Sequence, residues 1–322
     1  MRPAWIDVVE LLYHTTRCAS MDVEETAKAI KDMRIRGAGR IARACASALY
    51  EFADTYKGDD REMLMHDIED AKETLIASRP TAVSLYNGVM ASLKGIDKET
   101  DVDAILSTIK GRAEEFIDNS YEAVNSIAEL GSSIIRDGDV IMTHCNSSAV
   151  ISTLKRAHEQ GKNIKVFATE TRPWRQGLIT SRELADAGID VTLIVDSAAC
   201  LMMDNVDKVF VGADTVTAQG TLVNKVGTSQ LALVAHEKGI PFYACAETYK
   251  FSPLTLNGDD VRIEVRDIRE IAKEGEVPDT VKIYNPVFDR TLGRYITYYI
   301  TELGMISPSS ARETIVELFN ED

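Results

Sequence analysis

A cysteine lies in the stretch VIMTHCNSSA, where a short apolar run ends at His144-Cys145 and small hydrogen-bonding residues follow. The apolar run predicts a buried strand, and Ser147 or Ser148 is a typical start for the next helix. Free N–H groups at a helix N-terminus lower the pKa of a thiol and can also hold a phosphate. Cys145 is therefore a candidate for proton transfer, and a half-buried thiol beside a helix cap is the alternative.

A carboxylate follows a second apolar run, in VFVGADTV. A partly desolvated Asp214 could exchange protons near neutral pH, and a helix cap or structural hydrogen-bond acceptor is the alternative. His144 points to the opposite face of its strand from Cys145, so we expect a buried histidine with satisfied hydrogen bonds. No His/Asp cluster has metal-ligand spacing, and the sequence predicts no metal site.

Cationic, glycine-bearing stretches stand out against an acidic background. In MRIRGAGRIARAC, Gly37 and Gly39 would let backbone N–H groups approach an anion, and Arg36 could bind it with two hydrogen bonds. In ASRPTAVSL, Pro80 fixes Arg79 just before a predicted helix start. These features predict one anion-binding group.

A second cationic group consists of Asn224-Lys225 in LVNKVGTS and Lys250 in AETYKF. Solvated surface lysines are the alternative. Two anion sites around one cleft would suit a ligand that is phosphorylated at both ends.

The composition excludes several classes of protein. The chain has 322 residues, 36 Lys and Arg against 51 Asp and Glu, and a net charge of −15, which argues against a nucleic-acid surface. No stretch approaches the ~18 apolar residues of a membrane span, and the N-terminal sequence does not fit a signal peptide. The five cysteines form no CxxC pair, which is typical of reduced thiols in the cytoplasm, and all except Cys145 are expected in the core.

The periodicity changes along the chain. Residues 5–130 predict helices, whereas DVIMTHC, IKVFATE, DVTLIVD, KVFVGAD and PFYACAE predict strands that mostly alternate with helices. This indicates an α/β protein with a helical N-terminal domain (1–134) and a Rossmann-like parallel-sheet domain (135–322). VKIYNP is expected to be the last strand, after a solvated charged insertion. A GxGxxG fingerprint is missing, so no nicotinamide or flavin cofactor is expected.

Six stretches carry a resemblance to a known superfamily: RIRGAGRIA, SRPTAVSL, GDVIMTHCNSSAV, ATETRPWRQG, GADTVTAQGTLVNKVGT and AETYKF. Over about residues 25–310 the chain resembles the superfamily that unites the regulatory α, β and δ subunits of initiation factor 2B with sugar-phosphate isomerases. Within it, the sequence is most similar to the archaeal ribose 1,5-bisphosphate isomerases. This implies conversion of ribose 1,5-bisphosphate to ribulose 1,5-bisphosphate in AMP breakdown, without a cofactor.

The resemblance also implies roles for individual residues. Cys145 matches the proton acceptor of the family and Asp214 its proton donor. Asp214 would open the furanose ring, Cys145 would take the C2 proton, and Asp214 would then relay a proton between the oxygens on C1 and C2. The substrate-binding positions that match are Arg36, Gly37, Ala38, Gly39, Arg79, Ser147, Ser148, Ala149, Asn224, Lys225 and Lys250. The resemblance further implies a cytoplasmic homo-oligomer, a dimer or a hexamer of dimers, with AMP as a possible activator.

Two related groups are the alternatives. Methylthioribose 1-phosphate isomerases share the Cys and Asp pair but usually carry Gly-Ala-Pro and Asn-Ala-Gly where this chain has Gly37-Ala38-Gly39 and Asn146-Ser147-Ser148. The regulatory initiation-factor subunits generally lack the Cys and Asp pair, so its presence favours an enzyme. A hydride shift between C1 and C2 is an alternative to proton transfer.

Overall fold

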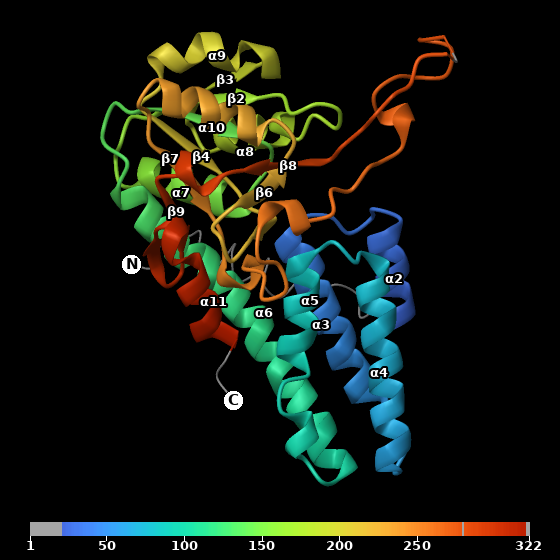
Figure 1. The fold of residues 1–322 in the computed structure, drawn as a ribbon. Coiled ribbons are helices and arrows are strands. Elements are labelled where there is room, and N and C mark those ends of the chain that lie inside the picture. Colours follow the sequence, from blue (N-terminus) through green and yellow to red (C-terminus); the bar gives the residue numbers. More distant parts are fainter. Residues whose placement is uncertain (1–20, 279, 320–322) are drawn as a thin grey trace. The chain divides into compact units, whose positions relative to one another are not determined.

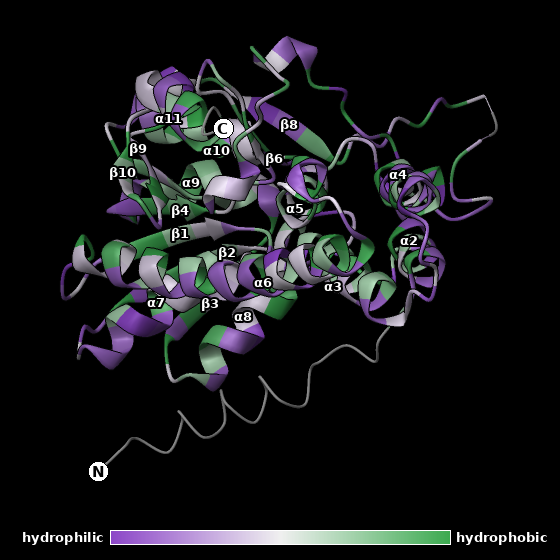
Figure 2. Ribbon diagram, turned by 90° about the horizontal axis from the view of Figure 1, so that it is seen from below, coloured by the Kyte–Doolittle hydropathy of each residue, from purple (hydrophilic) through white to green (hydrophobic). Residues whose placement is uncertain are grey.

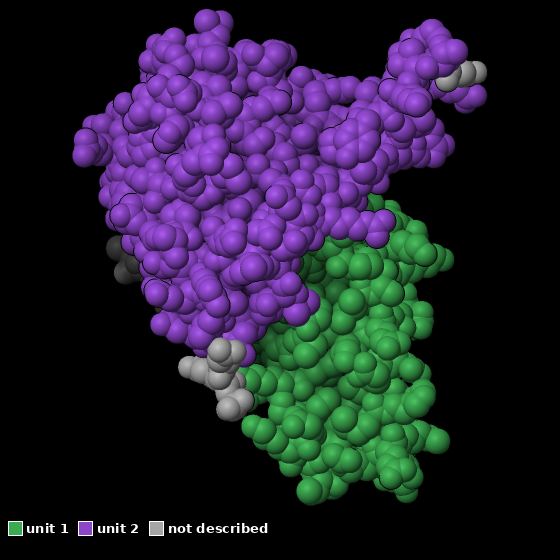
Figure 3. Space-filling model, viewed as in Figure 1, with its two compact units in different colours: residues 1–120 green, residues 121–322 purple. Residues whose placement is uncertain are grey.

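The computed structural model describes residues 21–278 and 280–319 and divides the chain into two compact units, residues 1–120 and 121–322 (Figures 1 and 3). The division falls inside the long helix α6, Val102–Ser133. The first strand begins only at Val140. The domain boundary after residue 134 stays a prediction.

The N-terminal unit is helical throughout its described part, as its periodicity predicts. Besides the first part of α6, its helices are α2 (Val23–Lys31), α3 (Ala38–Thr55), α4 (Arg61–Ser78) and α5 (Val83–Ser92). The N-cap residues Asp22 and Asp60 each accept a hydrogen bond from a backbone N–H of the first turn, which fixes where α2 and α4 begin. Apolar faces of these helices pack into one core that includes Leu49, Leu75 and Ile105.

The C-terminal unit is built on a seven-stranded sheet in the order β10-β9-β7-β4-β1-β2-β3. All neighbouring strands are parallel except β10, which is antiparallel to β9. The predicted fold class is therefore confirmed. The strands are β1 (Val140–His144), β2 (Lys165–Thr169), β3 (Asp190–Ile194), β4 (Lys208–Val211), β7 (Phe242–Cys245), β9 (Tyr298–Thr301) and β10 (Gly304–Ile306).

Helices cover both faces of this sheet because alternate strand residues point to opposite sides. Ile141 of β1 packs in one apolar cluster with residues of α6, α7 (Ser148–Glu159) and α8 (Gly177–Asp186). The next residue, Met142, packs on the other face with α9 (Ala199–Met202), α10 (Thr228–Glu237) and α11 (Ala311–Phe319). Figure 2 shows apolar residues along the central strands and polar residues on outward helix surfaces. Within the described ranges, each helix is too short or too polar to span a bilayer.

A second, antiparallel sheet was not predicted from the sequence. It consists of β5 (Thr215–Val216), β6 (Leu222–Lys225) and β8 (Phe288–Thr291), in the order β5-β6-β8. Strands of two to four residues give too little alternation for a periodicity argument. This small sheet carries Lys225 at the end of β6 and begins directly after Asp214.

The prediction that VKIYNP forms the last strand is wrong. Residues 281–285 are not in a strand, and Pro286 makes a single bridge to Val265. Val281, Lys282 and Tyr284 are exposed, and Pro286 has no N–H to donate to a ladder. Continuous pairing begins two residues later, where β8 joins β6, and the large sheet is completed instead by β9 and β10. The preceding charged segment is largely exposed, as predicted.

The strand order contains a topological switch point between β1 and β4. From β1 the chain moves outward to β2 and β3, and then returns to the other side of β1 as β4. In register, His144 lies opposite Val211, so both strands end at the same edge of the sheet. Ligands of open parallel sheets bind beyond the carboxyl ends of the strands at such a point. Cys145 follows one of these two strands, and Asp214 follows the other.

Candidate active site

Cys145 lies between β1 and α7 in an unusual backbone conformation. Its φ of 70° is left-handed, a region that side chains with a Cβ rarely occupy. The Cys145 N–H donates to Thr171 Oγ1 at 2.9 Å, and its carbonyl accepts from Thr180 Oγ1 at 2.7 Å. Two hydroxyls from other segments therefore hold both peptide groups of this residue.

The left-handed conformation gives a stability test of this geometry. The conformation costs an L-residue with a Cβ about 1–2 kcal/mol, and glycine avoids this cost. We therefore expect Cys145→Gly to have a free energy of unfolding about 1 kcal/mol higher than Cys145→Ala, although glycine normally destabilises. Urea unfolding of both variants measures this difference. A lower stability for the glycine variant would contradict the left-handed geometry.

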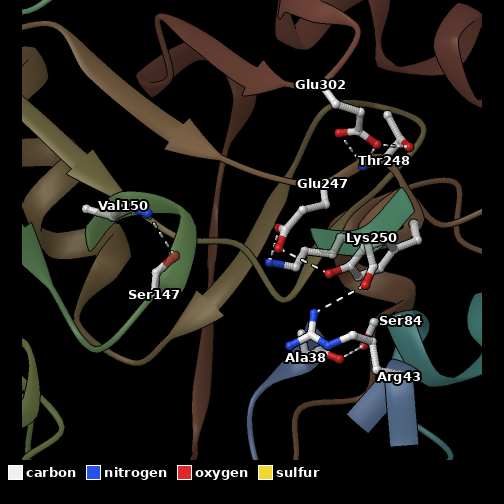
Figure 4. Close-up of polar contacts among 11 residues, drawn as sticks. Ala38, Arg43, Ser84, Ser147, Val150, Glu247, Thr248, Lys250 and Glu302 are labelled. Atoms are coloured by element: carbon white, nitrogen blue, oxygen red, sulfur yellow. Dashed lines mark hydrogen bonds and ion pairs between the residues drawn. The ribbon is translucent and has the colours of Figure 1, made fainter. Parts of the chain in front are cut away.

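The N-terminus of α7 begins directly after the cysteine, as predicted. Ser147 is its N-cap, and Ser147 Oγ accepts a hydrogen bond from the Val150 N–H at 3.4 Å (Figure 4). The N–H groups of Ser148 and Ala149 belong to the first turn, which has no acceptors within the helix, so they are available to an anion. A Cβ on Gly212, just after β4, would lie 2.7 Å from Ser147 Oγ, so this glycine lets the helix start approach β4.

The electrostatic surroundings of Cys145 differ from the prediction. Burial raises the pKa of the Cys145 thiol to about 11, although the Lys225 charge opposes this and Asp214 and Asp196 add to it. The expectation of a thiol with a lowered pKa at the helix N-terminus is therefore wrong for this structure, because desolvation outweighs the local effect. Lys225 and Asp214 therefore lie close enough to Cys145 for their charges to change the pKa of its thiol.

Asp214 is half-buried and held by its backbone. Its N–H donates to the carbonyl of Val223 on β6 at 3.0 Å, which ties the end of the β4 segment to the small sheet. Strand β5, not a helix, follows it, so Asp214 is not a helix cap. Its carboxylate accepts no hydrogen bond from any residue in the described part of the chain. The carboxylate is therefore available to a ligand, and its role as a structural acceptor is excluded there.

Asn224 and Lys225 are buried on β6, so the alternative of solvated surface residues is wrong for them. Asn224 Nδ2 donates to Thr228 Oγ1 at 3.0 Å, and Lys225 Nζ lies 5.1 Å from the centre of the Phe288 ring. An aromatic face stabilises a cation with little access to water. The small sheet therefore presents a positive charge to the thiol.

His144 is buried and hydrogen-bonded on both ring nitrogens, as predicted. Its Nε2 lies 2.9 Å from the carbonyl of Val226, which can only accept, so Nε2 donates. Its Nδ1 lies 2.6 Å from Thr169 Oγ1. Burial lowers the pKa of His144, so the ring is neutral and ties β1 to the end of β6. This histidine supports the site without supplying a second base.

Lys250 is also buried, and it forms an ion pair with Glu247. Lys250 Nζ lies 2.5 Å from Glu247 Oε2, and Tyr249 OH donates to Glu247 Oε1 at 3.1 Å (Figure 4). Burial opposes ionisation of Glu247, but the Lys250 charge and the hydrogen bonds hold the pKa of Glu247 below its usual value. Glu247 follows the end of β7 and fixes Lys250 at the same edge of the sheet as Cys145.

The first cationic group lies in the N-terminal unit. Exposed Arg36 precedes Gly37, whose φ of 88° and N-cap position turn the chain into α3, and Gly39 lies inside this helix. The Ala38 carbonyl accepts a hydrogen bond from Ser84 Oγ at 3.0 Å, so the start of α5 meets the start of α3 (Figure 4). This contact brings the RGAG and SRPTAVS stretches together.

Arg79 lies at the C-cap of α4, and α5 begins at Val83, so Arg79 precedes a helix start less directly than predicted. It is half-buried.

The other cysteines divide into two classes. Cys45 and Cys245 are buried, as predicted, and burial raises the pKa of each to about 12. Cys200 is exposed on α9, so its predicted place in the core is wrong. Cys18 lies outside the described residues.

Two residues around Cys145 were missed in the sequence, and so was the pairing of Glu247, a residue at a predicted strand end, with Lys250. Thr171 and Thr180 hold the cysteine peptide groups, and Glu247 holds Lys250. Opposite charges at i and i+3 were a visible signal for the Glu247 and Lys250 pair. No local pattern marks the two threonines, which lie 26 and 35 residues after Cys145 in sequence.

Comparison with known proteins places the chain in a wider group. A model of the Initiation factor 2 subunit family matches residues 34–308. A protein of Methanocaldococcus jannaschii named ribose 1,5-bisphosphate isomerase is 47% identical over 304 residues, which cover 94% of this chain and 97% of that protein. One of Archaeoglobus fulgidus with the same name is 48% identical over 296 residues, covering 92% and 93% of the two chains.

The fold has a solved counterpart. The crystal structure of 5-methylthioribose 1-phosphate isomerase from Pyrococcus horikoshii OT3 superposes with a TM-score of 0.78 and 34% sequence identity. The match covers 94% of this chain and 88% of that one. The arrangement of a helical part followed by a parallel-sheet part is therefore shared with a sugar-phosphate isomerase.

Proposed function

The chain belongs to the initiation factor 2 subunit family, and we propose that it is an aldose–ketose isomerase that converts ribose 1,5-bisphosphate to ribulose 1,5-bisphosphate. One observation carries this proposal. Cys145 and Asp214 follow the adjacent parallel strands β1 and β4 at the switch point of the sheet, and the Asp214 charge acts on the Cys145 thiol. Relatives that are 47% and 48% identical over most of the chain bear the name of this enzyme.

In the proposed reaction, Asp214 first acts as an acid. Its protonated carboxyl donates to the ring oxygen, which opens the furanose and leaves a positively polarised C1. The C2 proton becomes acidic at this point, and the Cys145 thiolate removes it, leaving an enol between C1 and C2. Protonation of Asp214 also removes one of the two negative charges that raise the pKa of Cys145.

The second half of the reaction restores both groups. The oxygen on C1 carries a phosphate and has no proton to exchange, so the expected relay between the oxygens on C1 and C2 is replaced by a simpler step. Asp214, now a carboxylate, takes its proton from the oxygen on C2. The Cys145 thiol returns a proton to C1, and the C2 ketone forms. One hydrogen has then moved from C2 to C1 and one from O2 to the former ring oxygen. General acid–base catalysis of this kind contributes ~10²–10⁴-fold per group.

Substrate binding is proposed to use two anion-binding groups. In the C-terminal unit, the N–H groups of Ser148 and Ala149 and the Lys225 cation suit a phosphate. The same set includes Ser147 at the start of α7, Asn224 beside Lys225 on β6, and Lys250 after β7. The N-terminal unit supplies Arg36, the backbone of Gly37, Ala38 and Gly39 at the start of α3, and Arg79. Orienting a sugar through both phosphates would supply much of the remaining rate enhancement.

The biological setting of the reaction is likewise a proposal. By resemblance to the archaeal enzymes, we place the activity in cytoplasmic AMP degradation, in a homo-oligomer that is a dimer or a hexamer of dimers, with AMP as an activator. Methylthioribose 1-phosphate isomerisation and a non-catalytic regulatory role are the alternative functions.

A paired substrate assay tests the proposed function. The full-length protein is incubated separately with ribose 1,5-bisphosphate and with methylthioribose 1-phosphate, and ketose formation is followed in each case. We expect the kcat/KM for ribose 1,5-bisphosphate to be at least ~100-fold above that for methylthioribose 1-phosphate. Only the bisphosphate can form charged contacts at both ends, and each such contact is worth about 1.5–3 kcal/mol.

The other outcomes discriminate between the alternatives. Preferential turnover of methylthioribose 1-phosphate would show that the protein is a methylthioribose 1-phosphate isomerase. Binding of either compound without ketose product would favour a regulatory subunit and reject the proposed reaction. Adding AMP to the same assay tests activation directly.

A further inference from the structure

We propose that Thr171 and Thr180 are positioning residues that hold the Cys145 backbone in its left-handed conformation and so aim the thiol at the substrate. This inference rests on the proposed function of Cys145 as the base. The two hydroxyls bind the two peptide groups that flank the Cys145 Cα: Thr171 Oγ1 accepts from the N–H at 2.9 Å, and Thr180 Oγ1 donates to the carbonyl at 2.7 Å.

Both threonines are held by residues outside the segment between β1 and α7 that contains Cys145. Each is buried, with 0% exposure for Thr171 and 1% for Thr180. Thr171 itself has a φ of 62°, and its N–H donates to Asp196 Oδ1 at 2.7 Å. Asp196 therefore holds the Thr171 backbone from the segment directly after β3, and the Thr171 hydroxyl also contacts Thr169 and His144.

Thr180 completes the arrangement from the first turn of α8. Its hydroxyl also accepts a hydrogen bond from Asn146 Nδ2 at 3.1 Å, so it binds both Cys145 and the residue after it. A residue other than glycine keeps a left-handed backbone conformation only where several contacts from the surrounding structure hold it. Such residues cluster at functional sites. Here hydrogen bonds from two separate segments supply that constraint, and the residue held is the proposed base.

The arrangement has a consequence for catalysis. A β-strand that simply continued past His144 would send the next side chain to the far face of the sheet. The left-handed turn at Cys145 redirects the chain before the helix begins, at the edge where Asp214 also lies. A misplacement of about 1 Å costs up to ~10²-fold in rate, so losing either hydroxyl should lower kcat and change KM little.

The test compares threonine to valine with threonine to serine at both positions. Valine keeps the branched shape and removes the hydroxyl, whereas serine keeps the hydroxyl. We expect Thr171→Val and Thr180→Val each to lower kcat for ribose 1,5-bisphosphate about 10–100-fold with KM within about twofold. Thr171→Ser and Thr180→Ser should recover kcat to within about threefold of the wild-type value.

A second measurement does not depend on turnover. In a Cys18→Ser, Cys200→Ser background, iodoacetamide reports on Cys145 because Cys45 and Cys245 are buried. We expect each valine variant to be alkylated at least ~3-fold faster at pH 8, since a released loop exposes the thiol and raises its ionised fraction. The serine variants should match the background protein.

Each outcome bears on the inference. A valine variant with unchanged kcat and unchanged alkylation would overturn the role of that threonine, whatever its melting temperature. A serine variant as impaired as the valine variant would also overturn it. If Thr171→Val does not fold, the Thr180→Val variant by itself tests whether the threonine hydroxyls position Cys145. If the wild-type protein turns over no bisphosphate, the proposed function fails, and the alkylation comparison still decides whether the threonines position the cysteine.

Discussion

Replacement of Cys145 by Ser, or of Asp214 by Asn, is expected to lower kcat by ~10²–10⁴-fold and to leave the fold intact. A serine hydroxyl keeps the size of the thiol but is a far weaker acid, so its anion is not available near neutral pH. An asparagine side chain can neither donate a proton to the ring oxygen nor accept one from O2. Each change thus removes a complete proton-transfer role, worth ~10²–10⁴-fold.

Steady-state kinetics with ribose 1,5-bisphosphate measure the loss, and titration calorimetry measures substrate affinity in the same variants. The affinity should stay within a few-fold, because neither group belongs to the proposed anion-binding sets. Cys200→Ser is the matched control, since Cys200 is an exposed thiol on the helix α9. Near-normal turnover in Cys145→Ser or Asp214→Asn would reject the assignment of that residue.

The second large effect is expected at Lys225. Its charge lowers the pKa of Cys145 against the stronger effect of burial, and its cation also suits a substrate phosphate. Lys225→Met removes both contributions and should lower kcat/KM at least about 10–100-fold, because a charged hydrogen bond is worth about 1.5–3 kcal/mol. The thiol also loses a charge that lowers its pKa, which adds to this loss.

The pH dependence separates the two contributions. Below its pKa the thiolate fraction rises tenfold with each pH unit, so alkylation of Cys145 should increase with pH up to about pH 11 in the wild-type protein. In Lys225→Met the whole profile should move to higher pH, because the thiol loses its nearest favourable charge. Lys165→Met is the control, since Lys165 is exposed at the start of β2, at the opposite edge of the sheet. An unmoved profile would show that Lys225 does not act on the thiol.

The sequence alone determined the main architecture and led to Cys145 and Asp214 as the proposed reactive pair. Apolar runs of four or more residues alternate with amphipathic segments, which predicts the parallel strands β1, β2, β3, β4 and β7. Because parallel strands end at one edge, the same pattern placed Cys145, Asp214 and Glu247 together at that edge. Such inferences succeed for the central strands because their burial on both faces gives continuous apolar runs, whereas the strand β3 at the end of the sheet has no buried residue.

The tertiary structure decided what depends on distant segments. The short strands β5, β6 and β8 have no periodicity of their own, and their pairing, together with the His144 contact to Val226, brings Lys225 to Cys145. The thiol pKa is set by burial under neighbouring elements, which outweighs the helix N-terminus that is visible in the sequence. The left-handed turn at Cys145 likewise depends on hydrogen bonds to Thr171 and Thr180. These partners lie 26 and 35 residues away in sequence, so no local pattern in the chain predicts them.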